Sequence, residues 1–176
     1  MATSDPGSVR VPESIQALLG ARLDRLSPEE RLVIRSAAVV GKVFWWGAVE
    51  ELSPETVRTR VGGALQTLVR NALIRPEPST FAGEDAFRFH HILIQEAAYR
   101  GTPKEVRADL HEAFAIWLEG IAGDRIVELE EVIGYHLEQA YRYRGELAPV
   151  TERERALATR AGLRLAPAGI RAFERR

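Results

Sequence analysis

Apolar residues recur at spacings of three and four along most of this chain, which is the pattern of helices that bury one face. Up to residue 70 the spacing predicts four helices, over about 12–26, 28–41, 44–52 and 55–70. Ser27-Pro28 and Ser53-Pro54 mark two of the starts, because each places a capping hydroxyl before a proline that suits the first helical turn. The first part of the chain is therefore expected to be helical.

The pattern then changes to the alternation of apolar and polar side chains that is typical of strands. Residues 72–77 and 86–90 are two such segments, and a polar link that contains glycine joins them. We expect the two strands to pair as a β-hairpin. The second strand passes without a turn into an amphipathic helix, over about 92–100, that begins at His90-His91.

Three further helices are predicted over about 103–119, 128–143 and 151–173, with Pro167 expected to kink or split the last one near Leu163. The short breaks between them are typical of antiparallel packing. We therefore predict a mainly α protein in three parts. These are a flexible N-terminal arm (1–10), a winged-helix domain with one β-hairpin (11–100), and a small antiparallel helical bundle (101–176) like the start of a tetratricopeptide (TPR-like) repeat array.

Composition narrows the classes of function. The chain has 24 basic and 25 acidic residues among 176, so it lacks the global positive field that drives nonspecific nucleic-acid binding. The absence of cysteine excludes a disulfide framework, a thiolate nucleophile and a cysteine-ligated zinc site. No apolar run reaches the roughly 18 residues of a membrane span, so we expect a cytoplasmic protein that makes no membrane contact.

The motifs do not predict a self-sufficient enzyme. Gly41-Lys42 is followed by Val43 and lacks the upstream glycine of a phosphate-binding loop, so we expect no nucleotide cofactor held by this chain alone. The four histidines lack the i, i+4 spacing with a carboxylate that would predict a metal site. They are His90, His91, His111 and His136. We interpret the last two as packing or surface residues.

Four segments taken together resemble a known family. They are VPESIQALLGARLDRLSPEERLVIRSAAVVGKVF (11–44), LVRNALIRPE (68–77), DAFRFHHILIQEAAYRGTPKEVRADLHEAFAIWLE (85–119) and GYHLEQAYRY (134–143). Their order and spacing resemble the region that follows the nucleotide-binding domain in bacterial STAND-type ATPases. Such proteins include LuxR-type regulators related to MalT and proteins that join an adenylate/guanylate cyclase domain to a predicted ATPase. The resemblance spans about residues 11–145.

In that family the ATPase module switches between closed ADP-bound and open ATP-bound states, and the winged helix folds over the nucleotide in the closed state. The resemblance thus implies a non-catalytic signal-transduction and protein-interaction module, whose winged helix clamps a nucleotide-binding ATPase domain in cis or in trans. ATP or ADP would be bound only together with that partner domain. We also expect an apolar patch, to which Arg22, Leu23 and Val39 to Phe44 contribute, that could support self-association when the ATPase is absent.

One residue is carried over from the family. Related eukaryotic and plant switch proteins have a Met-His-Asp sequence at the end of the winged helix, and its histidine approaches the ADP phosphate. His91 takes the place of that histidine, and Ile92 stands where the aspartate would be. A histidine at a helix start can donate a hydrogen bond to phosphate, which makes His91 the predicted nucleotide-sensing residue. The alternative is that His91 only caps or packs against the hairpin.

A second function is kept open, that of a DNA-binding winged-helix transcription regulator. Its recognition helix would be 55–70, and its wing would be the hairpin. The DNA-contacting residues would then be Arg58, Arg60, Gln66, Arg70 and, on the wing, Arg75. This local surface would be basic. Against this reading, Gly62-Gly63 lies in the middle of the predicted helix, the wing has no lysine, and a similar density of arginines is common on solvated helix faces, so DNA is the less favoured partner.

Overall fold

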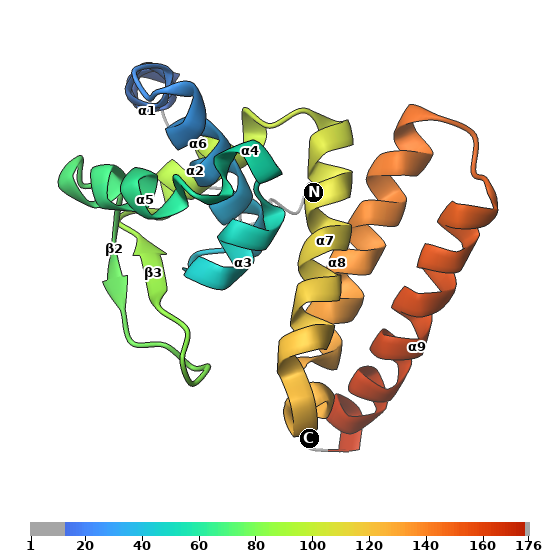
Figure 1. Ribbon diagram of the computed structural model, residues 1–176. Coiled ribbons are helices and arrows are strands. Elements are labelled where there is room, and N and C mark those ends of the chain that lie inside the picture. The colour runs from blue at the N-terminus through green and yellow to red at the C-terminus, as the bar shows by residue number, and fades with distance from the viewer. Residues whose placement is uncertain (1–12, 175–176) are drawn as a thin grey trace, which may run out of the picture.

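The computed structural model describes residues 13–174, so the arm predicted over 1–10 lies outside the described part. Those residues form a head (13–100) beside a bundle of long helices (104–174) (Figure 1). The head contains α1 (Glu13–Asp24), α2 (Pro28–Val40), β1 (Val43–Trp45), α3 (Trp46–Leu52), α4 (Glu55–Arg58), α5 (Val61–Arg70), β2 (Ile74–Glu77), β3 (Ala86–Phe89) and α6 (Ile92–Arg100). The bundle contains α7 (Lys104–Ala122), the 3-10 helix η1 (Gly123–Arg125), α8 (Ile126–Leu147) and α9 (Glu152–Glu174). The prediction of a mainly helical protein is confirmed.

The small sheet of the head has three antiparallel strands in the order β1-β3-β2. The predicted hairpin is present, with Ile74 opposite Phe89. The third strand was not predicted, because Phe44-Trp45-Trp46 was expected to open a helix. Phe44 instead pairs with Phe87, and α3 begins at Trp46. The large apolar side chain of Phe44 is wholly buried, and pairing with a strand distant in the sequence overrides the local helical pattern.

The start of α2 has the predicted geometry. The Ser27 hydroxyl accepts a hydrogen bond from the backbone N–H of Glu30 (3.2 Å), and the Glu30 carboxylate accepts one from the backbone N–H of Ser27 (2.9 Å). This capping box satisfies two backbone donors that the first helical turn leaves without partners. The chain is thereby directed into α2, whose side chains Val33, Ile34 and Ala37 lie at the centre of the head.

The single helix predicted over 55–70 is wrong, because α4 ends at Arg58 and α5 begins at Val61. Ser53 does not cap α4; its hydroxyl donates to the carbonyl of Val49 (2.7 Å). Val57 and Val61 are buried in the core on either side of the break. The backbone N–H of Arg60 donates to the carbonyl of Val57 (2.8 Å) in the turn that separates the two helices.

Glycines 62 and 63 of α5 provide a matched pair for testing this packing. A Cβ on Gly62 would lie 2.6 Å from Cη2 of Trp46, whereas a Cβ on Gly63 would have no neighbour within 4 Å. We expect Gly63→Ala to raise the free energy of unfolding by about 0.5–1 kcal/mol, because alanine is the better helix former. Gly62→Ala is expected to lower it, since the indole must move. Urea unfolding checks both, and equal effects of the two variants would contradict the predicted contact.

One cluster of buried apolar side chains runs from the head into the bundle. At the junction, the indole of Trp45 in β1 stacks on Trp117 (6.1 Å between centroids) and on Phe114 (6.5 Å), both of which belong to α7. Aromatic rings in such offset contacts contribute more than their buried area alone. The head is therefore held on α7 by packed aromatic rings.

The loop between β2 and β3, residues 78–85, is also fastened to the bundle. Phe81 is buried and meets Trp45 and Trp117 edge-on, with centroids 5.0 and 6.1 Å apart. Arg125 of η1 lies over the Phe81 ring (5.2 Å) and donates to the carbonyl of Thr80 (2.8 Å). The tip of the hairpin thus packs against the bundle.

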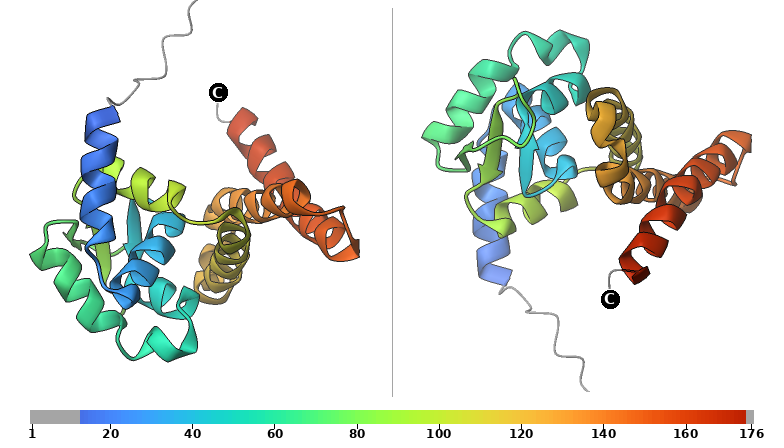
Figure 2. Two further views of the ribbon diagram at one scale, coloured as in Figure 1. Left: turned by 90° about the horizontal axis from the view of Figure 1, so that it is seen from above. Right: turned by 90° about the horizontal axis from the view of Figure 1, so that it is seen from below.

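In the bundle, α8 packs against both α7 and α9, and successive helices run in opposite directions (Figure 1). Figure 2 places α9 on the side of α8 that faces away from the head. Arg160 and Arg164 of α9 form ion pairs with Glu119 of α7 (2.9 and 3.0 Å). The expected split near Leu163 is wrong, because α9 continues through Pro167. Buried Leu157 and Ala161 hold the helix against its neighbours.

Candidate functional site

His91 lies where β3 ends and α6 begins, and it is the N-cap residue of α6. Its Nδ1 accepts a hydrogen bond from the backbone N–H of Leu93 (3.1 Å). With Nδ1 as the acceptor, the neutral imidazole carries its proton on Nε2. Because His91 is exposed, that N–H is available to an acceptor outside the chain. The strand therefore passes into a helix at a histidine, as the sequence predicted.

Two other basic side chains share this end of the sheet. The N–H of Phe89 donates to the carbonyl of Lys42 (3.1 Å), and the N–H of His90 donates to the carbonyl of Leu73 (2.9 Å). These bonds bring the start of β1 and the start of β2 to either side of the His90-His91 pair. Lys42 and His90 are exposed. An exposed lysine, two histidines and the start of α6 together favour an anionic group at this place.

The residues predicted to contact DNA on α4 and α5 are distributed unevenly. Arg58 forms an ion pair with Glu51 (3.2 Å), and Arg60, at the break between the helices, forms one with Glu29 (2.7 Å). Gln66 and Arg70 are exposed one turn apart on α5, and Arg70 donates to the hydroxyl of Thr67 (2.7 Å). Two of the four side chains are therefore engaged with carboxylates of the same chain.

The predicted wing residue Arg75 is exposed on β2, opposite Arg88 of β3. Arg88 forms an ion pair with Glu77 (2.7 Å) on the neighbouring strand. Because the loop 78–85 is fastened to α7 and η1, the hairpin does not extend freely from the head. Both features reduce the number of basic side chains that the hairpin could place against the phosphates of a nucleic acid.

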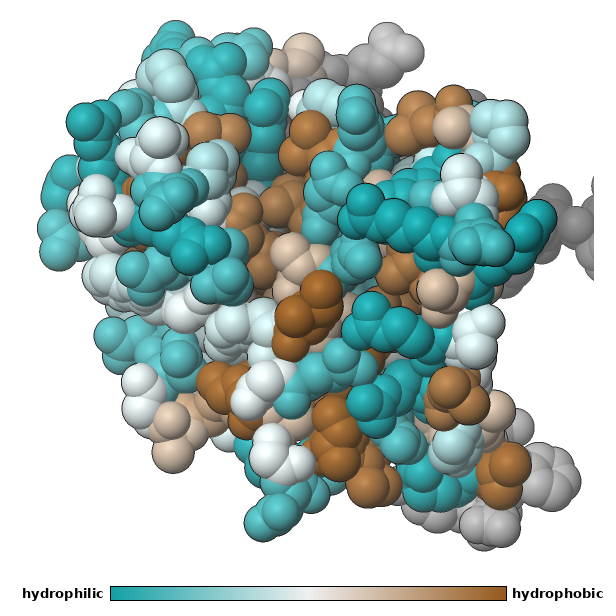
Figure 3. Space-filling model, turned by 45° about the vertical axis from the view of Figure 1, so that its right-hand side comes forward, coloured by the Kyte–Doolittle hydropathy of each residue, from teal (hydrophilic) through white to brown (hydrophobic). Residues whose placement is uncertain are grey.

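The prediction of an exposed apolar patch over Arg22, Leu23 and Val39 to Phe44 is wrong. Val39, Val40 and Phe44 are buried in the core, and Leu23 is half-buried, because β1 and α2 pack under the rest of the head. Large apolar side chains are exposed elsewhere, with Leu18, Leu163 and Ile170 more than half exposed. On the face drawn in Figure 3, apolar side chains form separate patches among polar ones.

A buried pair of histidines lies between α7 and α8. His111 and His136 are 1% and 4% exposed, and their Nδ1 atoms are 2.7 Å apart. One ring must donate and the other must accept, so the contact requires at least the accepting imidazole to be neutral. From the sequence, both residues were predicted only to pack in the core or to lie on the surface. Both residues lie on apolar helix faces, His111 near Phe114 and His136 between Ile133 and Leu137. This pattern could have predicted that they are buried, but not that they contact each other.

A chain of polar contacts extends from this pair to α6. His111 Nε2 lies 2.8 Å from the hydroxyl of Tyr99, and that hydroxyl lies 2.9 Å from the hydroxyl of Tyr143. Arg107 donates to the Tyr143 hydroxyl (3.2 Å), and its guanidinium lies over the rings of Tyr99 (4.9 Å) and Tyr143 (5.0 Å). We call these residues, with His136, the histidine–tyrosine network. It links α6, α7 and α8 at one point.

Burial controls the ionisation of this network. It lowers the pKa of His111 to about 3, with further lowering by His136 and Arg107, and it lowers the pKa of His136 to about 4. It also raises the pKa of Tyr99 far above its usual value, as does the hydrogen bond to Tyr143. Desolvation disfavours the charged form of each of these three groups, so the two imidazoles and the Tyr99 hydroxyl are neutral.

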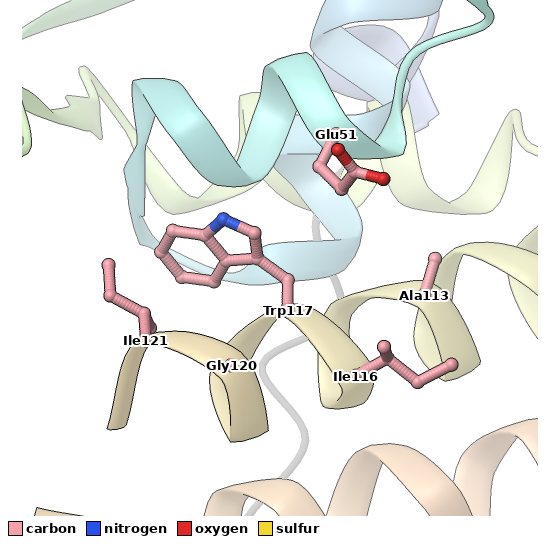
Figure 4. Close-up of a pocket in the computed structure, with 6 residues that line it drawn as sticks. All are labelled: Glu51, Ala113, Ile116, Trp117, Gly120 and Ile121. Atoms are coloured by element: carbon pink, nitrogen blue, oxygen red, sulfur yellow. The ribbon is translucent and has the colours of Figure 1, made fainter. Parts of the chain in front are cut away.

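A groove of about 510 Å³ lies between α3 and α7. Figure 4 shows the indole of Trp117 extending from α7 toward α3, with Glu51 on the opposite side. The lining consists of Glu51, Ala113, Ile116, Trp117, Gly120 and Ile121. It is mostly apolar and holds one carboxylate, which forms the ion pair with Arg58. The groove therefore suits an apolar segment better than a reaction that needs an acid and a base.

Residues 13–174 contain no group of three or more His, Cys, Asp or Glu side chains that could hold a metal ion. In the same range, no helix is both long enough and apolar enough to cross a membrane. No family model, no curated protein and no solved structure matches the chain.

Proposed function

We propose that this chain is a non-catalytic regulatory and interaction module of a STAND-type signalling ATPase or cyclase-linked regulator. The head is a winged helix that presses against a nucleotide-binding domain, supplied in cis or in trans. The bundle is the beginning of a TPR-like array that passes the state of the switch onward. His91 contacts the bound nucleotide.

The topology of the head supports the winged-helix assignment. From α2 onward the order is helix, strand, three helical segments and then two strands, and β1 pairs with the β3 edge of the β2-β3 hairpin. A winged helix combines a short helical cluster with a hairpin wing in this manner. α1 and α6 add helices at either end, and they pack against each other.

The position of His91 is the observation that carries the proposal. An exposed imidazole that caps α6 through Nδ1 has its Nε2–H directed to donate outside the chain. Helix N-termini and basic side chains attract phosphate, and Lys42 and His90 lie at the same end of the sheet. The site is incomplete as a nucleotide pocket, because the head offers an edge and not an enclosure. That is what a clamp closing over a nucleotide held by another domain would present.

DNA binding is the less supported alternative. Arg58 and Arg60 pair with glutamates, and Phe81 attaches the hairpin loop to the bundle. Among the described residues, Gln66, Arg70 and Arg75 are the exposed candidates that form no ion pair with a carboxylate. Phosphate contacts supply most of the affinity of such proteins for DNA. Three side chains on a chain without net positive charge offer few of these contacts.

Nucleotide release is the measurement that tests the proposal. A STAND-type nucleotide-binding domain is loaded with fluorescent ADP, and the 176-residue chain is added in trans. We expect the chain to slow ADP release at least about tenfold, the effect of one hydrogen bond to a charged group. His91→Ser keeps a capping hydroxyl but removes the imidazole, so it should lose most of this effect.

Arg155→Ser is the control, because it removes an exposed basic side chain on α9 of the bundle, away from the start of α6, and it should slow release as the unmodified chain does. Failure of the unmodified chain to bind both the ADP-loaded and the ATP-loaded domain would refute the proposal. Salt-sensitive binding of the chain to random duplex DNA would favour the alternative function instead.

A further inference from the structure

The histidine–tyrosine network lies at the point where the chain leaves the head and enters the bundle. Tyr99 is near the end of α6, and the turn that follows is held by Thr102, whose hydroxyl donates to the carbonyl of Ala98 (2.9 Å). Arg107 of α7 donates back to the carbonyl of Thr102 (2.8 Å). The contact of Tyr99 with His111, together with its contacts to Tyr143 and Arg107, therefore links the end of α6 to the bundle.

We propose that Tyr99, His111 and His136 form a protonation-sensitive latch between head and bundle, in which proton uptake by the imidazole pair releases the end of α6 while the rest of the fold persists. This inference goes beyond the proposed function and does not depend on it. It concerns a joint inside the chain, whereas the nucleotide contact is assigned to His91, at the other end of α6.

The geometry explains why the latch has two states. With both rings neutral, one Nδ1–H donates to the other Nδ1 across 2.7 Å, and the chain of donors continues through Tyr99 to Tyr143. A proton added to the pair places a positive charge on a buried ring near the Arg107 guanidinium, and a second proton leaves two N–H groups facing each other across that distance. The rings are buried, so they must separate or reach water to relieve the repulsion.

The surroundings offer no compensation for the added charge. The titratable and charged groups that face the pair are Tyr99 from α6, Arg107 from α7, and Tyr135 and Tyr143 from α8. Within the described residues, no carboxylate contacts either imidazole. Asp109 and Glu112 of α7 form ion pairs with Arg144 (2.8 and 2.6 Å). Opening toward solvent at the α6 end is thus the available response.

Amide hydrogen exchange tests the latch in the complete chain. With rates corrected for the intrinsic effect of pH, amides in the last turn of α6 and in the turn to α7 should lose protection at least about tenfold between pH 7.5 and pH 5. Amides at the centre of α2, under Val33 and Ile34, exchange only when the whole chain unfolds, so low concentrations of urea should speed their exchange and leave that of the α6 amides unchanged. Tyr99→Phe removes the hydroxyl and keeps the ring, so its α6 amides should be poorly protected already at pH 7.5 and should respond little to acid.

Two further variants separate the latch from general packing. Tyr141→Phe alters another half-buried tyrosine of α8, and it should behave as the unmodified chain does. His136→Asn replaces the titrating ring by a neutral amide, so the response to pH should fall at least threefold. Exchange of the α6 amides that depends on urea as strongly as that of α2 would overturn the proposal, because it indicates that α6 opens only when the whole chain unfolds. Unchanged α6 protection down to pH 5, or in Tyr99→Phe at pH 7.5, would overturn it as well.

Discussion

Replacing Phe114 by alanine is expected to lower the free energy of unfolding by about 3–5 kcal/mol. The ring is 1% exposed, and it packs between Trp45 of the head, Trp117 of the same helix, and His136 of α8, whose ring centroid is 4.7 Å away. Its removal leaves a cavity at the junction that none of these rigid rings can fill. Because the cluster of buried side chains is continuous across the junction, we expect one cooperative urea transition with a lower midpoint.

Ile116→Ala is the matched control on the same helix. Ile116 is 52% exposed at the edge of the groove, so its truncation is expected to cost less than about 1 kcal/mol. Circular dichroism and tryptophan fluorescence should report the same transition for both variants, since Trp45 and Trp117 lie at the junction. Two separate transitions, with one unaffected by Phe114→Ala, would show that head and bundle unfold independently and would contradict the prediction.

Features that depend on residues close in sequence could be predicted. The capping box of α2 requires only Ser27 and Glu30, three residues apart, and both of its hydrogen bonds are present. The β2-β3 hairpin joins segments linked by one short loop, and its pairing was also predicted. His91 belongs to the same class, because a capping residue is recognised from the strand before it and the helix after it.

Features that depend on distant residues could not be predicted. β1 exists because Phe44 pairs with Phe87, and no local pattern around residue 44 contains that information. The carboxylate that neutralises Arg60 is Glu29 of α2, so an arginine that suits DNA by its helix position is engaged within the chain. The contact of His111 with His136 likewise requires the alignment of α7 with α8, which helical periodicity does not determine.

That same histidine pair gives the second large effect, a loss of stability in mild acid. Lowering the pH from 7.5 to 5 is expected to reduce the free energy of unfolding by roughly 3–4 kcal/mol, or about 2 kcal/mol for each histidine. The pKa of an ordinary histidine is 6.5, whereas burial lowers the pKa of His111 to about 3 and that of His136 to about 4. Urea unfolding at a series of pH values measures the loss.

The sign follows from which state binds protons. Above pH 6.5 both imidazoles are neutral in the folded and in the unfolded chain, so stability does not depend on them. As the pH falls below 6.5, the unfolded chain takes up protons that the folded chain cannot, and the free energy of unfolding falls. The dependence ends near pH 4 for His136 and near pH 3 for His111, where the folded chain is protonated too.

Between pH 6.5 and 5 the stability depends on these two histidines and not yet on the carboxylates. Hydrogen bonds from Lys104 and from Thr151 lower the pKa values of Glu146 and Glu154 below the ordinary 4.5, so the stability linked to these two groups is lost only below about pH 4.5. A double variant in which His90 and His91 become serine should keep the same pH dependence, because both residues are exposed. If the folded chain instead binds two protons at His111 and His136 near pH 6.5, seen by NMR of the imidazole rings, then burial does not keep the pair neutral. The loss of stability in this window would then have to come from another group.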